Sequence, residues 1–267
     1  GGGAVLRVVG VNKIFYPGTV NEKHALKDIT FSMKTGDFVT VVGGNGAGKS
    51  TLLNCIAGVH KVDSGKIYID EVDVTDMPEH ERAKYIGRVF QDPMMGTAAG
   101  MMVEENLALA ARRGKRLGLR WAFRDDEFIE FKEKLASLNL GLEDQLKNRI
   151  GNLSGGQRQA ITLLMATLRK PKLLLLDEHT AALDPKTAEK VLALTKRMVE
   201  ENGLTTLMIT HNMRDALRFG NRLLMFSNGR IILDIDGDDK AKMTVHDLLD
   251  AFEHSGGDEV SDRMVLG

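Results

Sequence analysis

A glycine-rich loop constrains the fold of this chain more than any other feature, because it joins an apolar run, Phe38–Val42, to a helix-compatible run, Leu52–Ala57. The loop consists of Gly43, Gly44, Asn45, Gly46, Ala47, Gly48, Lys49, Ser50 and Thr51. A strand, a loop of this pattern and a helix form a phosphate-binding unit, in which backbone N–H groups converge on phosphate oxygens. Lys49 would reach the β and γ phosphates, and the Ser50 hydroxyl would ligate magnesium. The sequence therefore predicts an α/β fold that binds a nucleotide.

A second apolar run, Leu173–Leu176, ends in two acids, Asp177 and Glu178. At the end of a buried strand, Asp177 can hold magnesium through a water molecule while Glu178 polarises the attacking water. Adjacent carboxylates at a strand end also occur as a solvated helix N-cap. Beside a phosphate-binding loop, the pair favours nucleotide hydrolysis.

The remaining patterns indicate one α/β core with a helical insertion. Apolar and β-branched runs, bounded by Gly, Asp and Pro, predict strands at Val5–Val11, Ile29–Met33, Lys66–Ile69 and Thr205–Ile209. Between the third and fourth of these runs, from Glu104 to about Asn148, helix-forming residues predominate. A short helix is expected at Val245–Phe252, near the end of the chain.

Composition excludes several classes of protein. With 36 basic and 37 acidic residues the formal net charge is -1, so no overall field draws the chain to nucleic acid or to an anionic membrane. The longest uninterrupted apolar run is far below the roughly 20 residues that span a bilayer as a helix. The single cysteine, Cys55, cannot form an intramolecular disulfide, and no secretory signal pattern is present. The cytosol is therefore the expected compartment.

One pentapeptide names a family. The run Leu153–Gln157, which precedes a helix expected to open at about Arg158, resembles the signature sequence of ATP-binding cassette (ABC) proteins. Its members with phosphate-binding potential are Ser154, Gly155, Gly156 and Gln157. The hydroxyl and the N–H groups of the glycine helix start can bind a γ-phosphate, but Lys49 already occupies the other side of that phosphate, so two chains are needed. The alternative is a serine N-cap before an ordinary helix.

The resemblance covers the chain from about Leu6 to Arg230. It implies a P-loop NTPase (RecA-like) core with an N-terminal antiparallel β subdomain and an inserted α-helical signature subdomain. We expect a single ATPase domain over residues 4–235, with the helical subdomain at about 92–158. Residues 236–267 would form a short C-terminal tail with a helix.

The resemblance also implies roles for single residues. Gln91 is similar to the glutamine that contacts magnesium and reports to the membrane partner, so the implied metal ligands are Ser50, Gln91 and Asp177. Asp184 resembles the acid of the loop that links the two nucleotide sites, and His211 the switch histidine that contacts the γ-phosphate. Phe15 resembles the aromatic that stacks on adenine, with Tyr16 as the competing candidate. Two positions depart from the family pattern: His179 replaces the usual proline and Ala181 the usual serine.

The implied function is ATP hydrolysis, catalysed by Glu178 and His211, that drives a separate membrane permease. Two copies would enclose two Mg-ATP molecules head to tail, at the cytoplasmic face of the membrane. The runs Leu176–Asp184 and Ile209–Leu217 resemble those of bacterial uptake ATPases that work with a substrate-binding lipoprotein for amino acids, including aromatic ones. An export or lipoprotein-extraction ATPase is an alternative, since the Gly18–Val20 loop occurs there too. A soluble cassette of DNA repair or translation is a second alternative, but such proteins ordinarily have a coiled-coil insertion or a second cassette, and neither is found in this sequence.

Two surfaces are candidates for contact with the permease. Four methionines form a flexible apolar cluster suited to receiving a short helix, or else pack in the core: Met94, Met95, Met101 and Met102. The basic stretch 112–124, with Trp121, would approach lipid headgroups or the permease, or form a solvated helix face.

Overall fold

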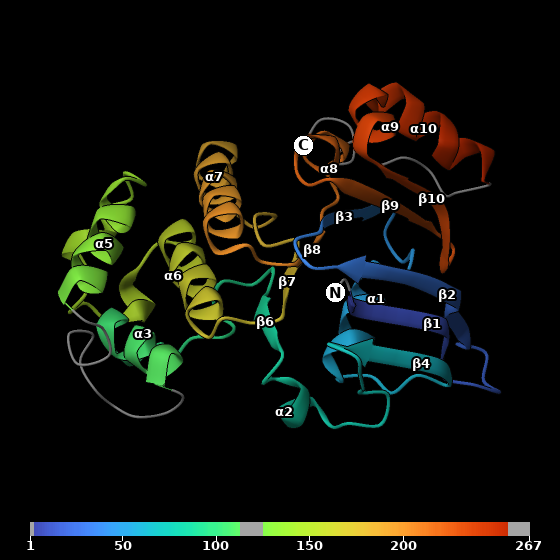
Figure 1. Cartoon of the computed structure of the whole chain (residues 1–267), viewed down its shortest axis with the longest axis horizontal. Helices are drawn as coiled ribbons and strands as arrows, with labels where there is room; N and C mark the ends of the chain where they lie inside the picture. Colours follow the sequence, from blue (N-terminus) through green and yellow to red (C-terminus); the bar gives the residue numbers. More distant parts are fainter. Residues whose placement is uncertain (1–2, 113–124, 256–267) are drawn as a thin grey trace. The chain divides into compact units, whose positions relative to one another are not determined.

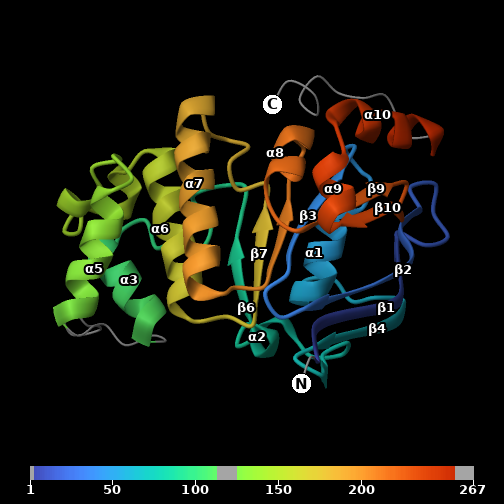
Figure 2. The same cartoon turned by 45° about the horizontal axis from the view of Figure 1, so that its top comes forward.

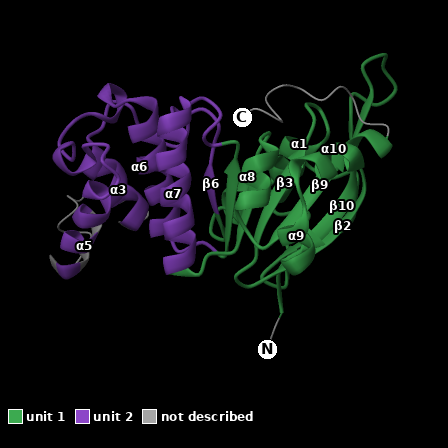
Figure 3. Cartoon of the chain, turned by 90° about the horizontal axis from the view of Figure 1, so that it is seen from above, with its two compact units in different colours: residues 1–86, 172–178, 202–267 green, residues 87–171, 179–201 purple. Residues whose placement is uncertain are grey.

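The computed structural model describes residues 3–112 and 125–255. It divides into two compact units (Figure 3). Unit 1 comprises residues 1–86, 172–178 and 202–267, and unit 2 comprises residues 87–171 and 179–201. Each unit is described separately below.

Unit 1 contains an antiparallel sheet built from the N-terminal strands (Figure 1). Its strands run in the order β2-β1-β4-β5 and are β1 (Ala4–Phe15), β2 (Lys23–Lys34), β4 (Ser64–Ile69) and β5 (Val72–Asp73). Strand β1 continues well past the predicted end at Val11, because register shifts let its pairing with β2 continue until Phe15 lies opposite Lys23. The predicted antiparallel β subdomain is thus confirmed.

The second sheet of unit 1 is mainly parallel. Its strands within this unit run in the order β10-β9-β3-β8-β7 and are β3 (Phe38–Gly43), β7 (Leu173–Asp177), β8 (Thr206–Ile209), β9 (Arg222–Ser227) and β10 (Arg230–Asp236). Strand β3 pairs in parallel with β8 and β9, and β7 with β8, whereas β10 is antiparallel to β9. All residues of β3 and β8 are buried, as the continuous apolar runs predict for parallel strands. The loops after β3, β7 and β8 therefore leave the same edge of the sheet.

Among its described residues, unit 1 has the helices α1 (Lys49–Ala57), α2 (Glu79–Arg82), α8 (Met213–Arg218), α9 (Gly237–Lys242) and α10 (Val245–His254). Helix α1 follows the phosphate-binding loop directly, and its buried residues join the core between the two sheets. Helices α8, α9 and α10 lie close together (Figure 2). The predicted C-terminal helix is confirmed as α10, which runs two residues beyond Phe252.

Unit 2 is mainly helical and includes residues 92–158, the predicted helical subdomain. Its elements are β6 (Ile86–Val89), whose first residue belongs to unit 1, α3 (Val103–Arg112), α5 (Asp125–Ala136), two 3-10 turns at Leu142–Asp144 and Ile150–Asn152, α6 (Gly155–Leu168) and α7 (Pro185–Asn202). The expected start of α6 at about Arg158 was wrong: the helix begins at Gly155, because Ser154 caps it. None of the helices in the described part of the chain combines the length and apolarity that a bilayer crossing requires.

Candidate nucleotide site

The phosphate-binding loop joins β3 to α1 in a conformation that depends on glycine. Gly46 and Gly48 have φ angles of 72° and 110°, in the left-handed region. A Cβ atom on Gly48 would also lie 2.8 Å from the carbonyl oxygen of Ala25, too close for any side chain. The loop closes on itself through a hydrogen bond from Ala47 N to Gly44 O, 3.2 Å long. The N terminus of α1 therefore points at the space that the loop encloses, as anion binding requires.

Lys49 is the buried cation of this loop. The residue is only 5% exposed, and its ammonium donates a 2.7 Å hydrogen bond to Gly43 O. The ammonium also lies 3.6 Å from Glu178 Oε1. Burial lowers the pKa of Lys49, and the carboxylates of Glu178 and Asp177 oppose that shift. These two acids thus favour the charged form that a phosphate would need.

The ends of β7 and β8 bring the predicted acids and the histidine to the same loop. Ser50 Oγ lies 3.5 Å from Asp177 Oδ1, and His211 Nδ1 lies 3.9 Å from Glu178 Oε2. Glu178 has a φ of 49°, which is uncommon for a residue with a side chain. Its N–H donates to Ile209 O at 3.0 Å, so β8 holds it in this conformation.

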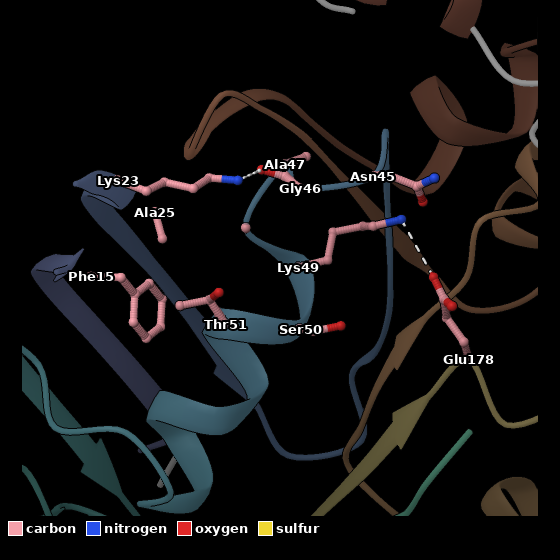
Figure 4. A pocket seen from close by; sticks show the side chains of 11 residues that line it. Phe15, Lys23, Ala25, Asn45, Gly46, Ala47, Lys49, Ser50, Thr51 and Glu178 are labelled. Carbon is pink, nitrogen blue, oxygen red and sulfur yellow. Dashed lines mark hydrogen bonds and ion pairs between the residues drawn. The ribbon is translucent and has the colours of Figure 1, made fainter. Parts of the chain in front are cut away.

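A cavity of about 280 Å³ extends along the loop (Figure 4). It is lined by Phe15, Lys23, Ala25, Asn45, Gly46, Ala47, Gly48, Lys49, Ser50, Thr51 and Glu178. In the close-up, Phe15 and Glu178 stand on opposite sides of the loop residues, as an adenine contact and a γ-phosphate contact would. Tyr16 is 68% exposed and stands outside this lining.

Sequence reasoning missed two residues that line this cavity and one that packs against Phe15. Lys23 and Ala25 line it, and Lys23 Nζ donates a 3.0 Å hydrogen bond to Gly46 O. The His60 ring, which no sequence motif marks, packs edge-on against Phe15 with a centroid distance of 5.1 Å. The register of the β1–β2 hairpin places Lys23 here, because it pairs Phe15 with Lys23, and this register is visible only in the structure.

The other predicted residues lie in unit 2. Ser154 caps α6: its hydroxyl accepts from Gln157 N at 3.3 Å, and Gln157 Oε1 accepts from Ser154 N at 3.0 Å. Asp184 precedes α7 and accepts from Thr187 N at 3.1 Å. Hydrogen bonds from the side chain and then the backbone of Thr187 lower the pKa of Asp184. Gln91 is exposed, after β6. The N-cap reading of Ser154 is thus present in the structure, and a capping hydroxyl at a glycine helix start is also placed to meet an anion.

His179, which stands where the family usually has proline, is part of a buried hydrogen-bond chain in unit 2. Its side chain is 2% exposed, and Nε2 lies 2.9 Å from Thr195 Oγ1. The Thr195 hydroxyl donates to Val191 O at 2.8 Å, so Nε2 of His179 carries the proton that Thr195 accepts. Burial lowers the pKa of His179 to about 4. The amide of the buried Gln159 donates to His179 O at 2.7 Å and to Phe90 O at 2.6 Å.

The donors near the loop suit magnesium. A hydroxyl and a carboxylate, from Ser50 and Asp177, are hard oxygen ligands. In the described part of the chain no three His, Cys, Asp or Glu side chains are grouped to hold a metal by themselves. Magnesium commonly keeps several waters and binds substrate phosphates through one or two protein groups, so this sparse donor set fits it.

A protein-family model described as "ABC transporter" matches residues 26–181, more than half of the chain. The chain belongs to the ABC transporter family. The tyrosine transport ATP-binding protein of Clostridioides difficile (strain R20291) is 42% identical over 94% of this chain and 100% of that protein. The methionine import ATP-binding protein MetN of Vibrio cholerae is 33% identical over 85% of this chain and 64% of that protein.

The bacterial ABC transporter cassette MJ0796, solved as a dimer, matches with a TM-score of 0.69 and 31% identity over 86% of this chain and 98% of that one. The same cassette has been solved in a post-hydrolysis state bound to ADP and Pi. The chain is thus an ABC ATPase of a transporter, with the predicted P-loop core. Membership of this family supports ATP as the nucleotide that the chain binds.

Of the two predicted partner surfaces, the structure describes the methionine cluster but almost none of the basic stretch 112–124. Met94 and Met95 are 51% and 50% exposed, whereas Met101 and Met102 are partly buried. Arg158 Nη1 contacts Met94 Sδ. Apart from Arg112 at the end of α3, the basic stretch 112–124 and Trp121 lie outside the described residues.

Proposed function

We propose that the chain dimerises head to tail around two Mg-ATP molecules and powers uptake of an amino acid by a separate membrane permease. The observation that supports hydrolysis most directly is that Lys49 and His211 each lie within 4 Å of Glu178, and that Lys49 and Glu178 line the same cavity. The tyrosine and methionine transport relatives support amino-acid uptake, and the dimeric cassette supports the pairing of two chains.

In this proposal each residue of the site has a distinct task. Phe15 stacks on adenine, and the loop residues 43–51 bind the phosphates through their N–H groups and through Lys49. Ser50, Asp177 and Gln91 would hold magnesium, which would supply positive charge beside the phosphates. Glu178 accepts a hydrogen bond from the attacking water and takes its proton, while His211 orients the γ-phosphate.

The partner copy completes the site. Ser154, Gly155, Gly156 and Gln157 of the second chain would grip the γ-phosphate, and Asp184 would join the two sites. ATP then supplies contacts that exist only in the closed dimer, and loss of the γ-phosphate removes them. The cycle is a ligand-driven population shift, which the permease and a substrate-binding protein convert into uptake at the cytoplasmic membrane face.

Affinity purification of the full chain from detergent-solubilised membranes tests this proposal. A permease together with a substrate-binding protein is the expected result, and tyrosine or methionine should then stimulate ATP hydrolysis in the reconstituted complex. A membrane protein without a binding protein would instead indicate export or lipoprotein extraction. Recovery of ribosomes or DNA would indicate a soluble cassette.

A pair of surface variants makes this experiment sharper. Met95→Glu should release the permease without loss of ATP binding, because it places a charge at the proposed apolar contact. Val20→Glu is the control, since Val20 is also apolar and is fully exposed on the β1–β2 loop of unit 1. Equal recovery of the permease with both variants would contradict the proposed contact surface.

A further inference from the structure

The C-terminal helix α10 is anchored in unit 1 by features outside the nucleotide site. Thr244 and Asp247 form a capping box at its start, with hydrogen bonds of 2.9 and 3.1 Å. Just before it, the buried Lys240 of α9 donates to the carbonyls of Phe219 and Gly220, at the end of α8. The segment is therefore docked by satisfied polar contacts at its entry.

The apolar face of α10 enters a buried cluster next to the phosphate-binding loop. Leu248 and Phe252, one helical turn apart, are 0% and 2% exposed and pack with Val42 and Met213, among others. Val42 immediately precedes the loop at Gly43, and Met213 follows His211 by two residues. The cluster thus packs against the start of the phosphate-binding loop and against the helix that follows the His211 loop.

Phe252 also reaches the loop itself. A Cβ atom built on Gly44 would lie 3.4 Å from Phe252 Cζ and 3.8 Å from Cε2, so the ring covers the side of Gly44 on which a side chain would stand. Gly44 is buried, and its carbonyl accepts the hydrogen bond from Ala47 N that closes the loop. The Phe252 ring therefore packs against the backbone turn whose N–H groups must point at phosphate.

We propose that Phe252 is a positioning residue for the nucleotide site, and that docking of α10 controls nucleotide affinity by holding the phosphate-binding loop in its bound shape. A preorganised loop does not have to be ordered when phosphate arrives, so the ring contributes to affinity without touching the ligand. The effect is reciprocal: nucleotide binding must stabilise the docked helix to the same extent. Any event that loosens the C-terminal segment then weakens ATP binding.

This inference rests on nucleotide binding at the cavity, but not on the transported solute or on dimer formation. The alternative is that α10 only completes the core. The two roles are separable, because Leu248 shares the helix, the cluster and the burial of Phe252, whereas the contact at Gly44 comes from Phe252.

The test compares the full-length chain with Phe252→Ala, Phe252→Leu and Leu248→Ala, using Mg-ADP as the probe because it binds without closure of the dimer. Isothermal titration calorimetry gives Kd, and a thermal melt without nucleotide gives Tm. Phe252→Ala should raise Kd about 5- to 10-fold, and Phe252→Leu should raise it about 2-fold. Leu248→Ala should lower Tm as much as Phe252→Ala does, but should change Kd by less than about 2-fold. Equal changes in Kd for Phe252→Ala and Leu248→Ala would overturn the proposal.

Hydrogen exchange of the unaltered protein provides a second measurement that does not depend on whether the variants fold. Saturating Mg-ADP should slow exchange at the amides of α10, residues 245–254, as well as at loop residues 43–51. If Mg-ADP slowed exchange in the loop but left exchange in α10 unchanged, the proposal would also be overturned. If the unaltered chain failed to bind Mg-ADP, the proposed function would fail first.

Discussion

The ammonium of Lys49 lies 3.6 Å from the carboxylate of Glu178, with both side chains largely buried at 6% and 18% exposure. The cation that we expect to meet the phosphates and the acid that we expect to activate water therefore share an ion pair within one cavity. A phosphate that binds Lys49 competes with this carboxylate, and the two negative groups repel each other. The Glu178 charge thus opposes nucleotide binding while serving hydrolysis.

Glu178→Gln should separate these two effects. Removal of the general base lowers kcat by about 100-fold or more, whereas removal of its charge leaves the affinity for Mg-ATP equal or tighter. Size-exclusion chromatography with Mg-ATP should show a stable dimer of this variant. If Glu178→Gln lost turnover without forming the ATP-dependent dimer, the proposed mechanism would be wrong. Glu143→Gln, which lies outside the cavity lining, is the control.

The Ser154 hydroxyl has two candidate tasks, which two substitutions can distinguish. Ser154→Ala removes the N-cap of α6 and should lower the free energy of unfolding by about 1 kcal/mol. Ser154→Asp keeps a capping oxygen, so unfolding in urea should change little. If Ser154 binds the γ-phosphate, the added negative charge of aspartate should abolish the ATP-dependent dimer of a Glu178→Gln background. Dimers formed equally well with Asp and Ser at this position would leave only the capping role.

The site was predictable wherever its residues are consecutive in the chain. The phosphate-binding loop follows β3 and precedes α1, so a strand, its loop and its helix reveal it without knowledge of the fold. Asp177 and Glu178 were likewise marked by the buried strand that they end. Their approach to Lys49 could be expected because parallel strands present their carboxyl ends at one edge.

Residues that reach the site through tertiary packing could not be identified from a local sequence pattern. Lys23 enters the cavity because the β1–β2 pairing shifts register several times, and no sequence pattern fixes those shifts. Phe252 packs on Gly44 across more than 200 positions of sequence, through a cluster assembled from β3, α8, β9 and α10. Its sequence context reads only as one apolar residue of an amphipathic helix.

His179 predicts an acid-sensitive contribution to folding stability. Its folded pKa is about 4, below the ordinary value of 6.5, so the unfolded chain binds more protons between these pH values. The stability that the neutral ring contributes is complete above pH 6.5 and is lost as pH falls towards 4. Urea unfolding at pH 5.0 should therefore give a free energy about 2 kcal/mol lower than at pH 7.5 from this residue alone.

The matched control for this residue is His179→Gln, which retains an N–H donor for Thr195 but has no charge to gain. The difference between the two pH values should shrink by about 2 kcal/mol in this variant. An undiminished difference would assign the acid sensitivity to other groups. Thr195→Val should lower stability at both pH values by about 1 to 3 kcal/mol, because it removes the hydroxyl that His179 contacts.

The choice between Phe15 and Tyr16 as the adenine contact can be decided by affinity. Phe15 lines the cavity and is braced edge-on by His60, whereas Tyr16 is 68% exposed with a left-handed φ of 52°. Since base stacking on an aromatic contributes about 1 to 3 kcal/mol, Phe15→Ala should weaken Mg-ADP binding by about 5- to 150-fold. Phe15→Trp should preserve binding, and Tyr16→Ala should change Kd by less than about 2-fold. A larger loss with Tyr16→Ala than with Phe15→Ala, measured by the same titration, would move the adenine contact to Tyr16 and require the β1–β2 loop to close over the nucleotide.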